Sequence, residues 1–367
     1  MNHNWNQQIG ARFRPLLLPS LPLLLPLLLA GAPVGAANGN ALVSLNPAVS
    51  VAHATQASML AATWAGKRGV AVGAHGIVLL SDDQGKSWRQ ARKVPLDVTL
   101  TAVSFASEQE GWAVGHAGVV LHTMNGGEEW EVQRSKPEQD RPLFGVHFFD
   151  KQHGVAVGLW SLVLTTSDGG RQWTERQLEA PPGGRRADLN LFGLFTGPGG
   201  ALYAPAEKGY VLHSADQGLS WTYLATGYRG SFWTGVALPD GTLLVGGLRG
   251  ALYRRASAAS NISNSNSGGG GGGAGIPAAA PVWSRISTGS TASIASLAAL
   301  GNGGSDASVL AVGLDGLTLR SEDNGMSFRT SYRQDRLPLQ AILPLAGHAT
   351  ALLSARGPVP VELRVSK

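Results

Sequence analysis

The sequence contains no cysteine, which excludes disulfide bonds and a lipid-modified N-terminal thiol. Charged residues make up only 14% of the chain, and no run of Lys or Arg interleaved with aromatics is present. Nucleic acid is therefore not an expected partner. The formal net charge of +5 is small for 367 residues, and only the N-terminal region has a long apolar run. Stability must come from packing alone.

The N-terminal region has the three parts of an export signal. Arg12 and Arg14 precede a Leu-rich stretch, Pro15–Leu29, and small residues around Ala36 and Ala37 follow it. The prolines within the stretch and its short length argue against a permanent membrane helix. We predict a signal peptide over residues 1–37 and an exported protein. The expected compartment is the periplasm, or the thylakoid lumen in a photosynthetic host, and an uncleaved signal anchor is the alternative.

One eight-residue phrase occurs five times after the signal region. Its copies are Ser81–Trp88 (SDDQGKSW), Thr123–Trp130 (TMNGGEEW), Thr166–Trp173 (TSDGGRQW), Ser214–Trp221 (SADQGLSW) and Ser321–Phe328 (SEDNGMSF). The first four terminal aromatics are 42, 43 and 48 residues apart. A period of this length indicates a repeat architecture.

Each part of the phrase has an expected structural role. The Asp or Asn accepts hydrogen bonds from backbone N–H groups of a turn, the Gly takes a positive φ, and the aromatic packs between neighbouring repeats. This is the Asp-box, or bacterial neuraminidase repeat (BNR). The predicted structural residues are Asp83, Gly85, Trp88, Asn125, Gly127, Trp130, Asp168, Gly170, Trp173, Asp216, Gly218, Trp221, Asp323, Gly325 and Phe328.

Short β-branched runs bounded by turn residues surround every phrase, such as Leu100–Phe105 and Gly111–Gly115. Four strands per repeat predict an all-β, seven-bladed β-propeller over residues 41–367. The seventh unit, from about Leu337, has only three strands. We therefore expect Ala41–Val51 to supply its fourth strand and close the ring. Six blades with a loose C-terminal cap are the alternative.

The fifth unit has no Asp-box. Residues 256–281, rich in Gly, Ser and Asn, occupy that place, and Trp283 follows where the phrase aromatic is expected. This composition cannot bury enough apolar surface to order itself, so we predict a disordered insertion in a turn.

Basic residues are more frequent than acidic ones in the loops expected on the face opposite the Asp-boxes. We predict that this basic rim, with an exposed tryptophan, binds an acidic segment of an integral membrane protein or membrane complex. The rim comprises Arg92, Lys93, Arg134, Lys136, Arg141, Trp160, Arg185, Arg186, Lys208, Arg229, Arg249, Arg333 and Arg336.

The sequence gives little support for catalysis or cofactors. Asp-boxes occur in sialidases, but the Arg-Ile-Pro signature and a Tyr–Glu pair of such enzymes are absent. The acids not committed to Asp-boxes are few, chiefly Glu207, Asp240 and Asp315. No spacing typical of a zinc or calcium site occurs. We expect no enzyme activity, metal or cofactor, and a monomeric chain.

The turns Val72–Gly76 and Val114–Gly118, the GWAVG run at Gly111–Gly115 and the Asp-boxes resemble the photosystem II stability/assembly factor family, especially its proteobacterial relatives. The resemblance covers about Leu42 to Val365, apart from the Gly-rich insertion. It implies an exported, non-catalytic scaffold that binds a membrane protein. Alternatives are a glycan-binding or transporter-accessory propeller, and a sialidase-like glycoside hydrolase.

Overall fold

The computed structural model describes residues 46–257, 282–301 and 307–359. The predicted signal peptide and most of the insertion, residues 258–281, lie outside these ranges. Within them, no helix has the length and apolar character needed to cross a membrane. The larger of two compact units, Leu42–Lys367, contains every strand described below.

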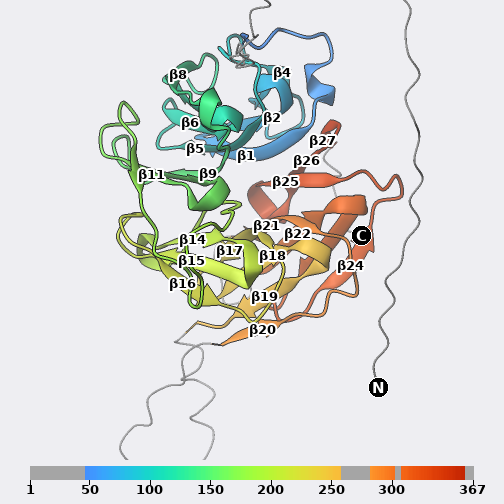
Figure 1. Cartoon of the computed structure of the whole chain (residues 1–367). Helices are drawn as coiled ribbons and strands as arrows, with labels where there is room; N and C mark the ends of the chain where they lie inside the picture. Colours follow the sequence, from blue (N-terminus) through green and yellow to red (C-terminus); the bar gives the residue numbers. More distant parts are fainter. Residues whose placement is uncertain (1–45, 258–281, 302–306, 360–367) are drawn as a thin grey trace, which may run out of the picture. The chain divides into compact units, whose positions relative to one another are not determined.

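The strands form seven antiparallel sheets, each a blade of a β-propeller, which confirms the predicted fold (Figure 1). Consecutive strands pair within each blade. The first four blades consist of β1 (Met59–Ala65), β2 (Arg68–Gly73), β3 (Val78–Ser81) and β4 (Arg89–Gln90); β5 (Leu100–Phe105), β6 (Gly111–Gly115), β7 (Val120–Thr123) and β8 (Glu131–Arg134); β9 (Leu143–Phe148), β10 (Gly154–Gly158), β11 (Val163–Thr166) and β12 (Thr174–Arg176); and β13 (Phe195–Thr196), β14 (Leu202–Pro205), β15 (Tyr210–Ser214) and β16 (Thr222–Ala225).

The last three blades follow the same order, and the seventh has only three strands among the described residues. They consist of β17 (Phe232–Ala237), β18 (Leu243–Gly247), β19 (Leu252–Arg255) and β20 (Trp283–Arg285); β21 (Ile294–Leu300), β22 (Ser308–Gly313), β23 (Leu317–Ser321) and β24 (Arg329–Tyr332); and β25 (Leu339–Pro344), β26 (Thr350–Ser354) and β27 (Gly357–Val359).

Short 3-10 turns connect many of these strands. Six of them join the second strand of a blade to its third: η2 (Ala74–Gly76), η3 (His116–Gly118), η5 (Leu159–Ser161), η7 (Glu207–Gly209), η8 (Leu248–Gly250) and η9 (Leu314–Gly316). The others are η1 (Ala54–Gln56), η4 (Pro137–Gln139), η6 (Pro198–Gly200) and η10 (Ala346–His348).

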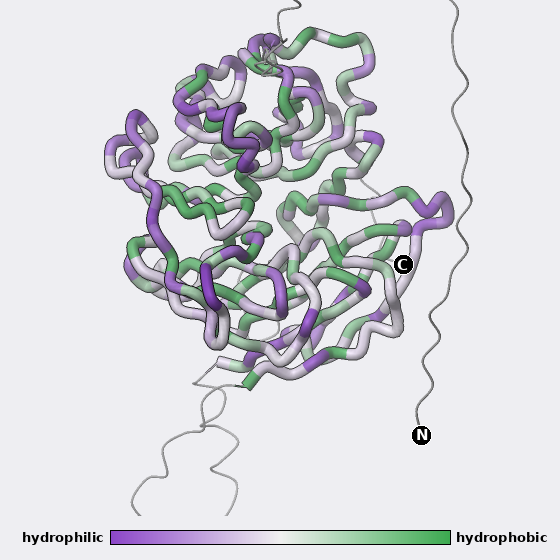
Figure 2. Tube along the Cα trace, viewed as in Figure 1, coloured by the Kyte–Doolittle hydropathy of each residue, from purple (hydrophilic) through white to green (hydrophobic). Residues whose placement is uncertain are grey.

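The core lies between neighbouring blades. Second strands such as β6 and β10 are buried along their whole length, because a blade covers each of their faces. Apolar colours follow the strands and polar colours the connections in Figure 2. The end of β2 requires glycine, since a Cβ on Gly73 would lie 2.0 Å from the carbonyl oxygen of Ser58. In the second blade, a Cβ on Gly115 would likewise lie 2.1 Å from the carbonyl oxygen of Thr99.

Each Asp-box forms the turn between the third and fourth strands, as predicted. In the first, the Ser81 hydroxyl accepts from Gly85 N at 2.8 Å and donates to Asp83 Oδ1 at 2.9 Å. Asp83 Oδ1 also accepts from Ser87 N at 2.9 Å, and Gly85 has a φ of 80°. Trp88 Nε1 donates to Gly85 O at 3.2 Å, which ties the aromatic to its turn.

The Asp-box aromatics pack against the preceding blade, as predicted. Trp130 lies in a core cluster with Val70 and Leu80 of the first blade, and Phe328 packs with Leu244 of the fifth. In the fifth blade, Trp283 packs in a cluster that includes residues of the fourth, so it keeps the aromatic role without an Asp-box. Trp173 differs from the other Asp-box tryptophans because its buried Nε1 has no hydrogen-bond partner among the described residues.

The predicted closing strand is wrong for the part of Ala41–Val51 that is described. Residues 46–51 form no strand and lie against the first blade, where Ala48 N donates to Val94 O at 3.1 Å. The ring closes instead by packing of β1 on β25 (Figure 1). Trp64 Nε1 of β1 donates to Pro344 O of β25 at 2.8 Å.

Candidate functional site

The turns between second and third strands and the connections between blades share one face, called here the turn face. Hydrogen bonds join them: His116 N donates to Thr99 O at 3.0 Å, and Ser161 N to Leu189 O at 2.7 Å. The Asp-boxes lie at the other end of the same strands, on the Asp-box face. The two sets of connections therefore lie on opposite faces, as predicted.

Six non-glycine residues stand at equivalent tips of the turn face. Each is the middle residue of a 3-10 turn with a φ between 53° and 58°, which L-residues seldom adopt. The repeated geometry fixes where each side chain begins, while the side chains themselves differ in charge and size. These tips are His75, Ala117, Trp160, Lys208, Arg249 and Asp315.

Ion pairs neutralise most of the predicted basic rim. Arg141 pairs with Glu175 at 3.0 Å, and Arg336 pairs with Asp315 at 2.8 Å. The remaining pairs are Arg92–Glu129, Lys136–Glu138, Arg186–Asp188, Lys208–Asp188 and Arg333–Asp335, at 2.8 to 3.9 Å. A basic side chain that is already paired with a carboxylate is less available to an acidic partner.

Two members of the predicted rim, Arg92 and Lys93, lie away from the tips. Arg92 N donates to Glu128 O at 2.9 Å, and Trp130 N donates to Lys93 O at 3.0 Å, so both run beside the second Asp-box. Arg134 donates to the Gly118 carbonyl, and burial lowers the pKa of its guanidinium. Arg185 is exposed and has no ion pair among the described residues.

Three arginines without ion pairs among the described residues lie together between the fourth and fifth blades. Arg229, Arg249 and Arg285 line one shallow pocket of about 370 Å³ together with Tyr228. All three arginines are exposed, and none has a carboxylate partner within the described ranges. Sequence reasoning identified the first two and missed Arg285, because the predicted rim was drawn from loops and Arg285 is the last residue of β20.

Hydrogen bonds connect the segments that form this pocket. Gly209 N donates to Gly230 O at 2.7 Å, which anchors the connection carrying Arg229. Tyr228 Oη donates to Leu248 O at 2.9 Å and thereby joins that connection to the turn carrying Arg249. Burial raises the pKa of the Tyr228 phenol, and the positive charges of Arg249 and Arg285 oppose this shift.

Trp160 stands on the turn face of the third blade with 56% of its surface exposed. Its backbone N–H donates to Asn190 Oδ1 at 3.1 Å. Asn190 is itself held by Glu207, whose carboxylate accepts from the Asn190 side chain at 2.9 Å and from its backbone at 3.0 Å. The indole is therefore an exposed aromatic on a fixed support.

The acids considered for catalysis each serve a structural contact. Glu207 holds Asn190, Asp240 accepts from the Thr242 N–H at 2.8 Å, and Asp315 pairs with Arg336. In the described part of the chain, no group of three or more His, Asp or Glu residues is arranged to bind a metal ion.

Solved structures of the same fold were found over most of the chain. A YCF48 structure with a bound D1 peptide has a TM-score of 0.63 and 19% identity, covering 85% of this chain and 97% of that one. YCF48 from Cyanidioschyzon merolae gives 0.62 and 16%, covering 85% and 96%. The Cps50 (Swd1) propeller of Myceliophteria thermophila gives 0.59 and 12%, covering 85% and 96%.

A search of curated protein sequences gave no match. The family model described as photosynthesis system II assembly factor YCF48 matches residues 45–138 and 134–272, more than half of the chain. The matched residues span the first four blades and most of the fifth, including four Asp-boxes. The chain belongs to the photosynthesis system II assembly factor YCF48 family.

Proposed function

We propose that this protein is an exported, non-catalytic assembly factor that binds an acidic segment of an integral membrane protein. The observation that carries the proposal is the convergence of Arg229, Arg249 and Arg285 on one pocket, where none of them has a carboxylate partner among the residues that the structure describes. Arginine recognises carboxylates through paired N–H donors, and arginine is enriched among the binding hot spots of protein interfaces.

Family membership supports the class of partner. The similar YCF48 structure contains a D1 peptide, and D1 is a membrane protein. The partner need not be D1 here, because any extended segment rich in Asp or Glu offers the same carboxylates. The protein acts as a monomer on the outer side of the membrane, in the periplasm or, in a photosynthetic host, the thylakoid lumen.

Charge removal at the pocket tests this function. We expect the triple variant Arg229→Gln/Arg249→Gln/Arg285→Gln to bind a fluorescent D1 peptide at least about tenfold more weakly, equal to about 1.4 kcal/mol. Binding by the original protein should weaken as salt increases. Fluorescence anisotropy measures both effects, and co-purification from detergent-solubilised host membranes extends them to the natural partner.

The matched control removes three positive charges that are already paired. The variant Arg92→Gln/Lys136→Gln/Arg186→Gln has the same net charge as the pocket triple variant. It should keep nearly full affinity for the D1 peptide, because these side chains already contact Glu129, Glu138 and Asp188. Equal losses in the two triple variants would refute the pocket as the binding site and leave only a general charge effect.

A further inference from the structure

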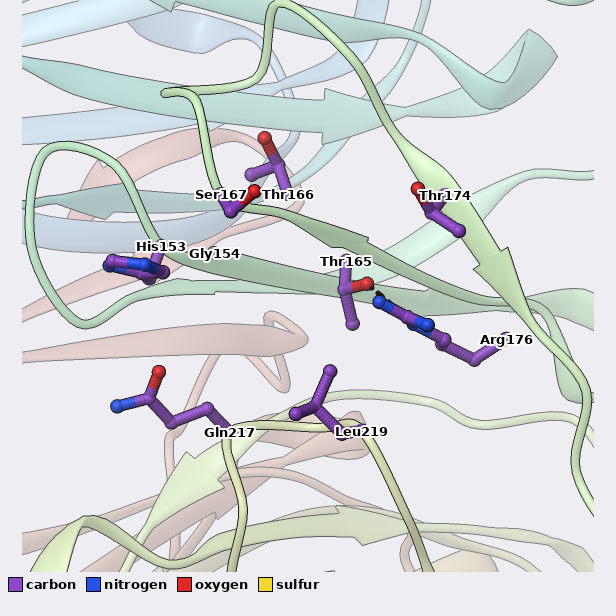
Figure 3. Close-up of a pocket in the computed structure, with 9 residues that line it drawn as sticks. All are labelled: His153, Gly154, Thr165, Thr166, Ser167, Thr174, Arg176, Gln217 and Leu219. Atoms are coloured by element: carbon purple, nitrogen blue, oxygen red, sulfur yellow. Dashed lines mark hydrogen bonds between the residues drawn. The ribbon is translucent and has the colours of Figure 1, made fainter.

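A second pocket lies on the Asp-box face, between the third and fourth blades (Figure 3). It has a volume of about 310 Å³, near the lower limit for small-molecule sites. The third blade contributes His153, Thr165, Ser167, Thr174 and Arg176, and the fourth Asp-box contributes Gln217 and Leu219. Figure 3 shows the two groups on opposite sides of the hollow.

The equivalent position between the first and second blades is closed by an ionic network. Arg68 bonds to Asp82 at 2.6 Å and to Glu128 at 3.2 Å. Arg89 pairs with the same two carboxylates, at 3.3 Å from Asp82 and 2.5 Å from Glu128. Since Glu128 belongs to the second Asp-box, the network spans both blades and fills the junction.

Strand register identifies the four replacements that open the pocket. Gly69 pairs with Ser81 in the first blade as Gly154 pairs with Thr166 in the third, so Arg68 corresponds to His153. Within the phrases, Asp82 corresponds to Ser167 and Glu128 to Leu219. One residue beyond the aromatic, Arg89 corresponds to Thr174. All four counterparts line the pocket.

Other junctions are also bridged. Glu110 of the second blade pairs with Lys151 of the third at 3.4 Å. Arg254 of the fifth blade donates to Asn324 O, in the Asp-box of the sixth blade, at 3.0 Å. Strand register makes Thr165 of the third blade equivalent to Arg254 of the fifth. The third blade therefore has a short hydroxyl side chain where the fifth has an arginine that reaches the next blade. Among the described residues, no hydrogen bond or ion pair joins the two sides of the pocket.

The lining combines one fixed cation with groups that both donate and accept hydrogen bonds. Arg176 Nε donates to Thr165 Oγ1 at 2.8 Å, which orients the guanidinium, and the described structure gives it no carboxylate partner. Ser167, Thr174 and Gln217 supply hydroxyl and amide groups. Leu219 is 57% exposed and supplies an apolar surface. No acidic residue lines the pocket.

We propose that this pocket binds an acidic monosaccharide unit, such as a hexuronate. The guanidinium of Arg176 suits a sugar carboxylate, the hydroxyl and amide groups suit sugar hydroxyls, and Leu219 suits the C–H face of a pyranose ring. The site is on the face opposite the arginine pocket that we propose for the membrane protein. An experiment that refutes one of these two proposals therefore does not refute the other.

Isothermal titration calorimetry with glucuronate, glucose and inorganic phosphate tests the proposal. We expect saturable binding of glucuronate, and binding at least tenfold weaker for glucose and phosphate. Leu219→Glu should weaken glucuronate binding at least tenfold, because the new carboxylate recreates the residue type of the closed first junction and competes for Arg176. Arg176→Gln should have a similar effect without adding a negative charge.

Met326→Glu is the matched control. Met326 occupies the same position of another Asp-box and is 60% exposed, so the substitution adds an identical charge at a distant junction. It should leave glucuronate affinity unchanged. The proposal is overturned if the original protein does not bind glucuronate, if glucose or phosphate binds as tightly, or if Met326→Glu weakens binding as much as Leu219→Glu.

Discussion

At the scale of single residues, tryptophan serves two opposite purposes in this protein. Trp130 is 1% exposed, meets Phe105 edge to face at a centroid distance of 6.2 Å, and donates Nε1–H to Gly127 O at 2.9 Å. Trp160 stands at a turn tip and is mostly exposed. A buried, hydrogen-bonded indole stabilises the blade junction, whereas an exposed one on a fixed turn is available to a partner.

Replacing each tryptophan by alanine should separate these purposes. Trp130→Ala leaves a large cavity between the first and second blades, and we expect a loss of about 3–5 kcal/mol in the free energy of unfolding. Trp160→Ala should change it by about 0.5 kcal/mol or less, because Ala117 already occupies the equivalent tip of the second blade. Urea denaturation measures both. A loss below about 1 kcal/mol for Trp130→Ala would contradict its role as a buried wedge.

At the scale of the structural element, the Asp-box turn depends on an ionised carboxylate. The Ser87 hydroxyl, and then its backbone N–H, stabilise the Asp83 carboxylate and lower its pKa from 3.8 to about 2. The second Asp-box has Asn125 instead, whose Oδ1 accepts from Glu129 N at 2.9 Å. The turn can therefore form around a neutral amide, which offers a natural comparison.

Asp83→Asn should reveal the pH dependence of this turn. The folded protein has the lower Asp83 pKa, so near pH 3 it binds fewer protons than the unfolded chain. The stabilisation from Asp83 is therefore complete above about pH 4 and decreases as the pH falls toward 2. We expect the difference in melting temperature between the original protein and Asp83→Asn to narrow between pH 7 and pH 2.5. A difference independent of pH would contradict the role of the charge.

Elements with a local sequence signal were predictable, and those fixed by distant contacts were not. The Asp-boxes follow from turn chemistry, and buried strands such as Gly111–Gly115 follow from their apolar pattern, so the blades were predicted correctly. The path of residues 46–51 depends on hydrogen bonds to Val94 and Asp97, which no local pattern specifies. The arginine pocket depends equally on tertiary placement, because Arg285 reaches it from the end of β20.

At the scale of the whole molecule, closure of the propeller relies on its first and last blades. Met59 and Leu79 of the first blade share a buried cluster with Ala341 and Leu353 of the seventh. Ser58 Oγ also donates to Gln340 Oε1 at 3.0 Å. These residues lie in or next to β1, β3, β25 and β26, so the ring closes without a strand from residues 46–51.

A chain that begins at Val51 tests this closure. It loses the hydrogen bonds of Ala48 with Val94, Asn46 with Asp97, and Val49 with Gln90, and we expect unfolding to cost about 1–3 kcal/mol less. It keeps β1, β25 and the bond from Trp64 to Pro344, so thermal unfolding should remain one cooperative transition. If the N-terminal segment closed the ring as a fourth strand, the same truncation would expose the edge of β27 and separate the terminal blades. Loss of cooperativity in calorimetry, or faster hydrogen exchange in both β1 and β25, would then be observed, and either result would contradict closure by direct packing of the two blades.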